Sequence, residues 1–535
     1  MNEMLFPFLG GLGLFLIGML LMSQGLVAFG GEVLKQVLSR FTGTPTMAAF
    51  TGALATVIVQ SSSATTVTLI GFVSAGLISF TQAIGVLIGA SLGNTATGWI
   101  VAGLGLKINL GFYTLPLIGL GALLKLMGRG RWAEFGMAIA GFGMMFMGLT
   151  TLQEGMRGLA GVFNFASLPV GGFGASVLIM LFGLALTAVL QSSTAAIATT
   201  LTALHTQTIN FDQAAALVVG AAIGTTMTGV LVTIGGTIHA KRTAVAYILF
   251  NAAAGALAIA LLPVLFWVIA WLGAHAGLDP GAMSLAAFHT LFIALGVVIF
   301  LPILPRFAGL VERLLPDKKE HTLTQRLDDS MLAIPSVALE ASQRALEETT
   351  ERMLGAYGRV LAGGTHTLSP GKLQELERSL DTAYAFVSRI ELRQDDAASA
   401  ARRIAQLHTI DHLIRFRSRL DELIHNGTDL TSPGYAWALS HNQKILDLAR
   451  NGLAEHRLAD ILPELQVNAA GLTELSRQMR HELLDGRGAL SSKAADILAK
   501  ADAYRWLERT AHHIWRISHY LAMGRPEGNA TADPS

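Results

Sequence analysis

The chain has 535 residues, of which 52% are hydrophobic and only 14% charged, a composition that is apolar for a soluble protein. The formal net charge is +1, so bulk electrostatics do not favour nucleic acid and we expect no nucleic-acid partner. There is no cysteine, which excludes disulfides and cysteine-based metal or nucleophile chemistry. Residues 1–305 contain only 15 Asp, Glu, Lys and Arg, whereas the remaining 230 residues contain 60. This division indicates a membrane part followed by a soluble part.

Long apolar stretches in residues 1–305 predict helices that span a lipid bilayer. Each is long enough, or nearly so, to cross a hydrocarbon core of about 30 Å. The stretch 243–273 is longer than one span, so we expect it to be tilted, broken at Pro263 or divided into two short elements. The predicted spans run near residues 5–28, 82–104, 109–127, 133–156, 212–236, 243–273 and 284–305.

Two further apolar regions, 45–79 and 173–207, are interrupted midway by glutamine and serine. Each half is expected to be too short to span the bilayer alone. We therefore predict that each region forms a re-entrant helical hairpin, which enters and leaves on the same side. Irregular backbone at membrane depth is tolerated only where protein or a water-filled cavity surrounds it.

The distribution of lysine and arginine predicts the orientation of these spans, because cytoplasmic loops carry an excess of both residues. With the N-terminus outside, the outer loops collect only Lys107 and Arg157. This orientation places the soluble C-terminal part in the cytoplasm. The inner loops then collect seven basic residues: Lys35, Arg40, Lys125, Arg129, Arg131, Lys241 and Arg242.

The membrane part contains an internal repeat. Residues 60–98 align with residues 191–229 at a constant offset of 131, with 15 identities in 39 positions. Each copy holds one span, one hairpin and two further spans, an odd number of crossings, so the second copy should be inverted. Inverted repeats with paired interrupted helices are typical of secondary transporters. We assign residues 1–131 to the first repeat and 132–305 to the second repeat plus the last span. The first spans align as well, with Gly11, Gly13, Gly18 and Gly25 matching Gly141, Gly143, Gly148 and Gly155.

The centres of the two hairpins carry matching motifs, Gln60-Ser61-Ser62-Ser63 and Gln191-Ser192-Ser193-Thr194, and no charged residue occurs between Arg40 and Lys107 or between Arg157 and Asp212. An ion bound there meets hydroxyls, amides and free backbone ends. The second half-helix offers N–H groups to an anion, and the first offers carbonyl groups to Na⁺. Because a buried multivalent anion without a basic partner is costly, co-bound cations supply a physical reason for coupling to Na⁺.

Packing of helices is the alternative role for small hydroxyl residues in a membrane protein. We favour packing for the scattered Ser and Thr, and a functional role for the doubled motif. Glu154 and Asp212 lie near span ends and are expected to be interfacial. For His289, a site role and a packing role remain equally open.

At these motifs the chain resembles the bacterial form of the type II sodium–phosphate cotransporter family, over about residues 1–305. The segments Gly89–Thr97 and Gly220–Thr228 match the family pattern, as does Phe250-Asn251, whereas Ser91 and Ala222 depart from it. The resemblance implies an all-α fold, Na⁺-coupled symport of inorganic phosphate and a location in the bacterial inner membrane. The substrate- and ion-binding residues expected from the motifs and the resemblance are Gln60, Ser61, Ser62, Ser63, Thr66, Asn94, Thr95, Gln191, Ser192, Ser193, Thr194, Thr225, Thr226 and Asn251.

Residues 306–523 are predicted to form a soluble bundle of long amphipathic helices, and residues 524–535 a disordered tail. This part resembles the PhoU-like domain, which implies a regulatory role and possible docking of a phosphate-signalling protein. Glu377 and Asp381 have the spacing of its metal motif, whereas Arg415 and His512 stand where acids are expected. A homo-oligomer is also possible. The helices are expected near 322–363, 369–394, 397–426, 434–456, 460–485 and 489–523.

The leading hypothesis is therefore a sodium-coupled phosphate symporter, with Na⁺ as the co-transported ion and no organic cofactor. One alternative is a phosphate-responsive signalling protein that uses its membrane part as a sensor. Another is a Na⁺-independent anion channel. An enzyme is not expected, because the membrane part holds no set of nucleophile, base and orienting group and no cluster of metal ligands.

Overall fold

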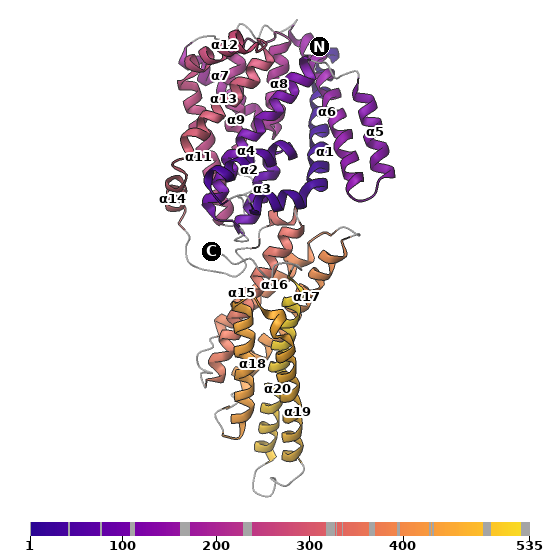
Figure 1. Ribbon diagram of the computed structural model, residues 1–535, viewed down its shortest axis with the longest axis vertical. Helices are drawn as coiled ribbons and strands as arrows, with labels where there is room; N and C mark the ends of the chain where they lie inside the picture. Colours follow the sequence, from indigo (N-terminus) through magenta and orange to yellow (C-terminus); the bar gives the residue numbers. More distant parts are fainter. Residues whose placement is uncertain are drawn as a thin grey trace. The chain divides into compact units, whose positions relative to one another are not determined.

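The structure is a computed structural model in which every regular element of the described residues is a helix (Figure 1). The chain divides into two compact units, Met1–Lys318 and Lys319–Ser535, called here the membrane unit and the helical unit. The residues described are 2–40, 43–74, 78–107, 113–160, 172–227, 238–316, 327, 329–333, 335–362, 370–392, 396–426, 430, 433–484 and 494–525.

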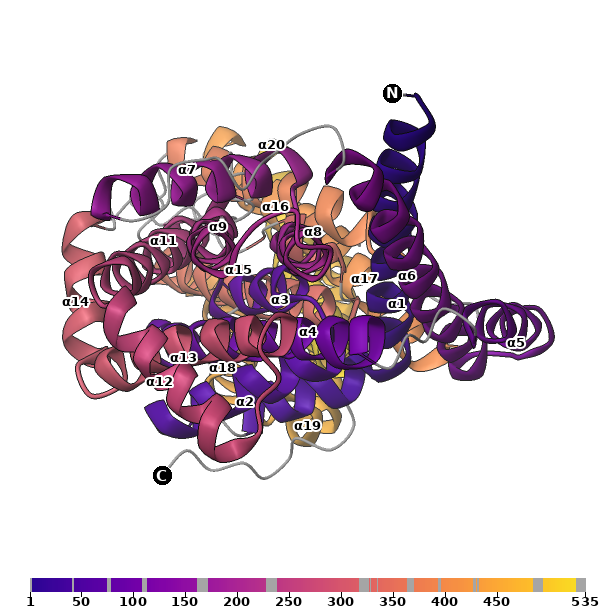
Figure 2. The ribbon, with the colours of Figure 1, turned by 90° about the horizontal axis from the view of Figure 1, so that it is seen from above.

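The membrane unit begins with a long helix that packs against α6, and α5 packs on the other side of α6; all three lie at one edge of the unit (Figures 1 and 2). The two interrupted regions form the helix pairs α2–α3 and α7–α8. The helices of the unit are α1 (Asn2–Arg40), α2 (Pro45–Val59), α3 (Ser62–Ser74), α4 (Phe80–Ile100) continued by the π-helix η1 (Val101–Lys107), α5 (Thr114–Met127), α6 (Arg131–Ala160), α7 (Phe173–Leu190), α8 (Ser193–His205), α9 (Phe211–Gly224), α11 (Ile238–Ala260), α12 (Leu262–Ala276), α13 (Ala282–Phe300) and α14 (Leu304–Leu314).

Six helical segments among the described residues are long and apolar enough to cross a bilayer. Together they make the chain a multi-pass membrane protein, as predicted. The segments are Leu5–Gly30, Phe80–Lys107, Arg131–Gly158, Phe173–Leu190, Ile238–Ala260 and Ala282–Phe300.

Some predicted spans differ from the helices. The prediction that each half of a hairpin is too short to span is wrong for α7, whose 18 apolar residues extend about 27 Å at 1.5 Å per residue. The stretch 243–273 does divide, because α11 ends at Ala260 and α12 begins at Leu262 with Pro263 in its first turn; proline lacks the N–H that a continuous helix needs there. In the predicted span 212–236, α9 ends at Gly224, and residues 228–236 lie outside the described part.

The packing of α1 against α6 confirms that the first spans of the two repeats run in opposite directions. A Cβ added at Gly11 would lie 2.8 Å from the carbonyl oxygen of Gly148, and one added at Gly18 would lie 2.7 Å from that of Gly141. Gly141 and Gly148 are the repeat counterparts of Gly11 and Gly18. Gly11 therefore contacts the counterpart of Gly18, and Gly18 contacts the counterpart of Gly11. A two-fold axis between antiparallel helices produces this reciprocal pattern.

The same correspondence holds where α2 packs on α4 and α7 packs on α9. A Cβ at Gly89 would lie 1.8 Å from the carbonyl oxygen of Ala49, and one at Gly220 would lie 1.9 Å from that of Met180. Met180 follows Ala49 by the repeat offset of 131 residues. Both helix pairs therefore approach at backbone contact, which only a residue without a side chain permits.

The helical unit is a bundle around an apolar core that includes Tyr357, Phe416 and Leu507. The predicted helix 322–363 is wrong at its start, because a short 3₁₀ turn (Asp329–Ala333) precedes α15, which begins at Pro335. Pro335 suits the start of α15, because a proline lacks an N–H and the first N–H groups of a helix have no partner within it. The other predicted helices agree to within several residues. The helices are α15 (Pro335–Leu361), α16 (Pro370–Ser388), α17 (Ala397–Asn426), α18 (Ala436–Ala454), α19 (Leu458–Leu484) and α20 (Ala494–Met523).

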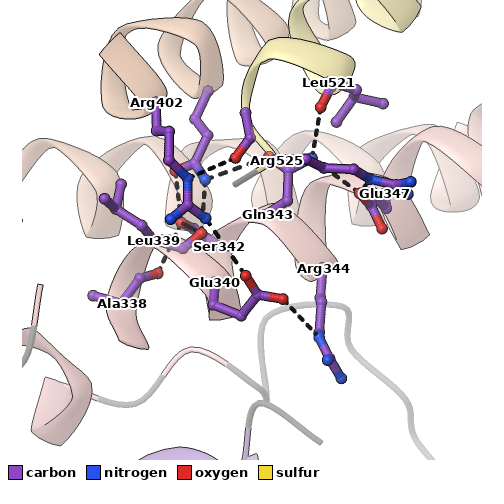
Figure 3. Close-up of polar contacts among 12 residues, drawn as sticks. Ala338, Leu339, Glu340, Ser342, Gln343, Arg344, Glu347, Arg402, Leu521 and Arg525 are labelled. Atoms are coloured by element: carbon purple, nitrogen blue, oxygen red, sulfur yellow. Dashed lines mark hydrogen bonds and ion pairs between the residues drawn. The ribbon is translucent and has the colours of Figure 1, made fainter. Parts of the chain in front are cut away.

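The predicted disordered tail is wrong for its first two residues. The carbonyl of Gly524 accepts a hydrogen bond from Arg402 Nε at 2.9 Å. The Nε of Arg525 donates to Glu347 at 2.8 Å (Figure 3). These contacts fix the end of α20 against α15 and α17 through charge-assisted hydrogen bonds. Residues 526–535 lie outside the described part.

Candidate ion and substrate site

The two glutamine–serine motifs line one cavity of about 330 Å³ in the membrane unit, called here the motif cavity. Both helix breaks thus meet at one place, although 131 residues separate them. No lining residue is charged. The lining is completed by α1 and by one residue that follows α9, and consists of Leu16, Ile17, Met19, Leu20, Ser23, Gln60, Ser61, Ser62, Ser63, Leu190, Gln191, Ser192, Ser193, Thr194 and Thr225.

Each helix break is made by a glutamine in left-handed backbone conformation. Gln60 has φ 55° and Gln191 has φ 52°, a region that costs a residue with a side chain about 1–2 kcal/mol. The side-chain amide of each donates to the carbonyl three residues earlier, Val57 at 2.5 Å and Ala188 at 2.6 Å. This bond satisfies an end carbonyl of the first half-helix and helps to hold the left-handed turn. Gln60 Oε1 also accepts from Thr97 Oγ1 at 3.0 Å.

The first serine of each motif caps the second half-helix. Ser61 Oγ accepts from the N–H of Ala64, and Ser192 Oγ accepts from the N–H of Ala195, both at 3.2 Å. An N-cap satisfies only part of the first turn, so other N–H groups there have no partner within the helix. The partial positive ends of α3 and α8 therefore both lie at the motif cavity.

The second serines occupy matching buried positions, with Ser62 8% and Ser193 7% exposed. Asn94 Nδ2, on α4 of the first repeat, donates to Ser193 Oγ of the second repeat at 3.4 Å. Asn94 is itself buried. The predicted residues Asn94 and Ser193 are thus brought together across the interface between the repeats.

Tyr247 on α11 contacts residues of the candidate site, and the sequence analysis did not single it out. It is buried, and its hydroxyl interacts with the side chains of Ser62, Ser91 and Thr225. These three residues come from α3, from α4 and from the end of α9, so the phenol connects both repeats beside the motif cavity. A signal was present in the sequence, because Tyr247 lies one helical turn before the singled-out Asn251 and hence on the same helix face.

Five of the predicted site residues do not line the motif cavity: Asn94, which bonds to the lining residue Ser193, and Thr66, Thr95, Thr226 and Asn251. Thr95 and Thr226 are repeat counterparts, and each hydroxyl donates to the carbonyl three residues earlier in its own chain segment, at 2.7 and 2.8 Å. Asn251 Nδ2 donates to the carbonyl of Tyr247 at 2.9 Å. Thr66 is buried on α3. The side chains of Thr95, Thr226 and Asn251 are thus engaged in local hydrogen bonds.

His289 is buried on α13 beside Phe292, with ring centroids 5.5 Å apart, and its Nδ1 has no hydrogen-bond partner among the described residues. It does not line the motif cavity. A larger cavity of about 980 Å³ lies elsewhere in the membrane unit, with Lys107, Asp212 and Asp279 in its lining. We place the candidate site at the smaller cavity because both motifs converge there.

The predicted metal pair lies in the helical unit on α16. Glu377 accepts from Arg417 at 3.0 Å, and Asp381 is exposed. Among the residues that the structure describes, no group of three or more His, Cys, Asp or Glu is arranged to hold a metal ion. Metal binding by this pair stays a prediction.

Inverted repeats whose paired broken helices meet at a neutral, hydroxyl-lined cavity have the architecture of a secondary transporter. The particular family follows from comparison with known proteins. A family model described as Na⁺/Pi-cotransporter matches residues 14–154 and 173–304, just over half of the 535 residues. The chain belongs to this family. No solved structure matches the chain.

Individual relatives agree with the family match. The uncharacterized protein YqeW of Bacillus subtilis is 32% identical over 304 residues, which cover 57% of this chain and 96% of the relative. The putative inorganic phosphate export protein YjbB of Salmonella typhimurium is 24% identical over 485 residues, or 88% of this chain and 86% of the relative. YjbB of Escherichia coli K12 is 24% identical over 413 residues, covering 75% and 73%. The similarity to YjbB therefore extends beyond the membrane unit.

Proposed function

We propose that the chain transports inorganic phosphate across the membrane together with Na⁺, and that phosphate binds in the motif cavity. One observation carries the proposal: two helix N-termini and two sets of serine hydroxyls from inverted repeats line a single cavity without a charged side chain. Membership of the Na⁺/Pi-cotransporter family supports the choice of phosphate as the anion.

Phosphate suits the hydrogen-bonding groups of the motif cavity. The first-turn N–H groups of α3 and α8 are donors with partial positive charge. The hydroxyls of Ser62, Ser63 and Ser193 can donate to phosphate oxygens. A tetrahedral anion can accept from several directions, so it can bridge donors from both repeats at once.

Sodium ions supply the positive charge that the protein side chains do not. Transfer of an anion from water into a cavity without Lys or Arg carries a desolvation penalty of several kcal/mol. Na⁺ beside the anion offsets part of this penalty. The carbonyl groups at the C-terminal ends of α2 and α7, next to the same motifs, and the motif hydroxyls are oxygen ligands of the kind that hard cations prefer.

The YjbB relatives are named as putative export proteins, which gives a second candidate: phosphate export without Na⁺. A coupled carrier can run in either direction, because the combined gradients of its substrates set the net flux. The dependence on Na⁺ therefore distinguishes the two candidates, and the direction of flux does not.

For the topology, we propose an N-terminus outside the bacterial inner membrane and a cytoplasmic helical unit. The support is the excess of lysine and arginine in the loops assigned to the inside. This arrangement would expose the helical unit to cytoplasmic metabolites.

The test is uptake of radiolabelled phosphate by purified protein in liposomes under an inward gradient of Na⁺ or, as the control, of K⁺. Coupling between two ligands commonly changes affinity by roughly 5- to 150-fold, so we expect initial uptake to be about ten-fold faster with Na⁺. Equal uptake in the two gradients would contradict sodium coupling and favour the Na⁺-independent carrier. Vesicles loaded with phosphate test efflux in the same way. If there is no uptake in either gradient and loaded vesicles also retain their phosphate, phosphate transport itself is contradicted.

A further inference from the structure

The helical unit contains an open pocket of about 560 Å³ bounded by α17, α19 and α20. We propose that this pocket, called here the basic pocket, binds a multiply charged phosphorylated anion larger than orthophosphate, of the pyrophosphate or nucleotide class. The proposal concerns a second site and does not depend on the transport function. The pocket is lined by His412, Arg415, Ser418, Arg419, Thr473, Glu508, Arg509, His512 and His513.

Positive charge predominates in the lining, because three arginines stand against one glutamate. Arg480, outside the lining, donates to that glutamate, Glu508, at 2.5 Å. Its negative charge is therefore already paired. The lining thus offers a net positive surface to a ligand, which favours binding of an anion.

The arginines keep donors available for such a ligand. Arg509 is exposed and makes no hydrogen bond or ion pair with another described residue. Arg419 Nη1 binds Glu422 at 2.6 Å, while its Nε is buried with no hydrogen-bond partner in the described part of the chain. Arg415 pairs with Asp411 at 3.0 Å on the surface, a contact of the kind that contributes little to stability. A buried unsatisfied donor costs about 1–3 kcal/mol, which a bound oxyanion would relieve.

Two histidines in the basic pocket touch each other, with the Nδ1 atoms of His412 and His513 3.2 Å apart. One ring must donate and the other accept, so at most one of the two can be protonated without breaking this bond. The pKa of each imidazole is lowered to about 4, chiefly by burial, and for His513 the neighbouring His412, His512, Arg419 and Arg415 contribute to that lowering. Both rings are therefore neutral at pH 7, and the arginines carry the charge of the pocket.

An anion should reverse this effect on the histidines. A negative ligand offsets the repulsion from Arg415, Arg419 and Arg516, so it raises the pKa of both imidazoles. Asp411 and Glu508 are the acids that face the cluster; Asp411 raises the pKa of His412, and Glu508 that of His512. Between pH 4 and 6.5, binding should therefore take up protons.

The residue types and the size of the pocket indicate the class of ligand. One guanidinium group can donate two parallel hydrogen bonds to two oxygens of the same phosphate or carboxylate group. A volume of about 560 Å³ lies in the range of sites for small organic molecules and exceeds what one orthophosphate fills. A metal ion fits less well, because the described residues include no group of three or more candidate ligands.

The test is calorimetric titration of the full-length protein in detergent with pyrophosphate, with ATP and, in a separate arm, with orthophosphate. The pocket variant is Arg415→Gln/Arg509→Gln, in which both side chains are exposed and the fold should persist. The matched control is Arg477→Gln/Arg505→Gln, because these arginines are exposed on α19 and α20, each paired with an acid three residues away, and lie outside the pocket.

We expect the pocket variant to bind pyrophosphate or ATP at least about ten-fold more weakly, since a hydrogen bond to a charged group contributes about 1.5–3 kcal/mol, and the control to bind as the native protein does. Heats measured at pH 5.5 in buffers of different ionisation enthalpy should show proton uptake, which His412→Gln reduces. Equal affinity in the pocket and control variants would overturn the proposal. Binding of orthophosphate alone, or of none of the three anions, would overturn it as well. Liposome uptake is measured separately, so a failure of transport leaves this result intact.

Discussion

Ser62→Ala and Ser193→Ala should each lower phosphate uptake into liposomes by roughly ten- to a hundred-fold, because a hydrogen bond to a charged ligand contributes about 1.5–3 kcal/mol. Both hydroxyls are buried at the motif cavity and occupy equivalent positions in the repeats. Neither substitution disturbs the N-caps, which Ser61 and Ser192 form. The measurement is the initial rate of radiolabelled phosphate uptake per amount of incorporated protein.

The control is Ser176→Ala, which removes a hydroxyl from the first turn of α7 away from the motif cavity and should transport normally. The size of the loss also tests whether the motifs share one site. Two independent sites in parallel would leave roughly half of the flux in each single variant, since independent sites add. Uptake at or above that level in Ser62→Ala and in Ser193→Ala would therefore contradict a shared site.

Gly89→Ala and Gly220→Ala should each destabilise the membrane unit by about 3 kcal/mol or more, the upper part of the range for overpacked cores. The added methyl carbon would lie 1.8 or 1.9 Å from a backbone carbonyl oxygen of the partner helix. Backbone cannot rotate away as a side chain can, so α2 and α4, or α7 and α9, would have to separate. The measurement is the midpoint of thermal unfolding in detergent.

Gly98→Ala is the matched control on α4, because the added Cβ would meet its nearest neighbour, Ala286, at an ordinary contact distance of 3.8 Å. Glycine in a helix interior is less favourable than alanine by about 1 kcal/mol, so this variant should be at least as stable as the native protein. Equal unfolding midpoints for Gly89→Ala and Gly98→Ala would contradict the close approach of α2 and α4.

The features of this protein that the sequence predicts correctly are those set by residues close together in the chain. The broken helices at Gln60 and Gln191 depend on residues within a few positions of each other. The division of 243–273 depends on Pro263 alone. Such features follow from backbone chemistry, and the structure has them where they were expected.

Contacts between distant segments explain what was missed. Tyr247 meets Ser62, Ser91 and Thr225 only because four helices converge, and no periodicity in one segment reports that. The matched pair Thr95 and Thr226 is expected at the site from the motifs and the resemblance, and neither residue lines the motif cavity. Their hydroxyls donate to carbonyls three residues earlier, so a matched position in the two repeats can also serve a local hydrogen bond.

The most direct test of the shared site uses the absence of cysteine from the chain. Ser63→Cys and Ser192→Cys place single thiols in the lining of the motif cavity at positions with solvent access, one in each repeat. The measurement is the rate at which a polar thiol reagent modifies each cysteine in Na⁺ buffer, with and without phosphate. Our account predicts that phosphate slows modification at both positions. Rates that phosphate leaves unchanged at both positions would contradict it.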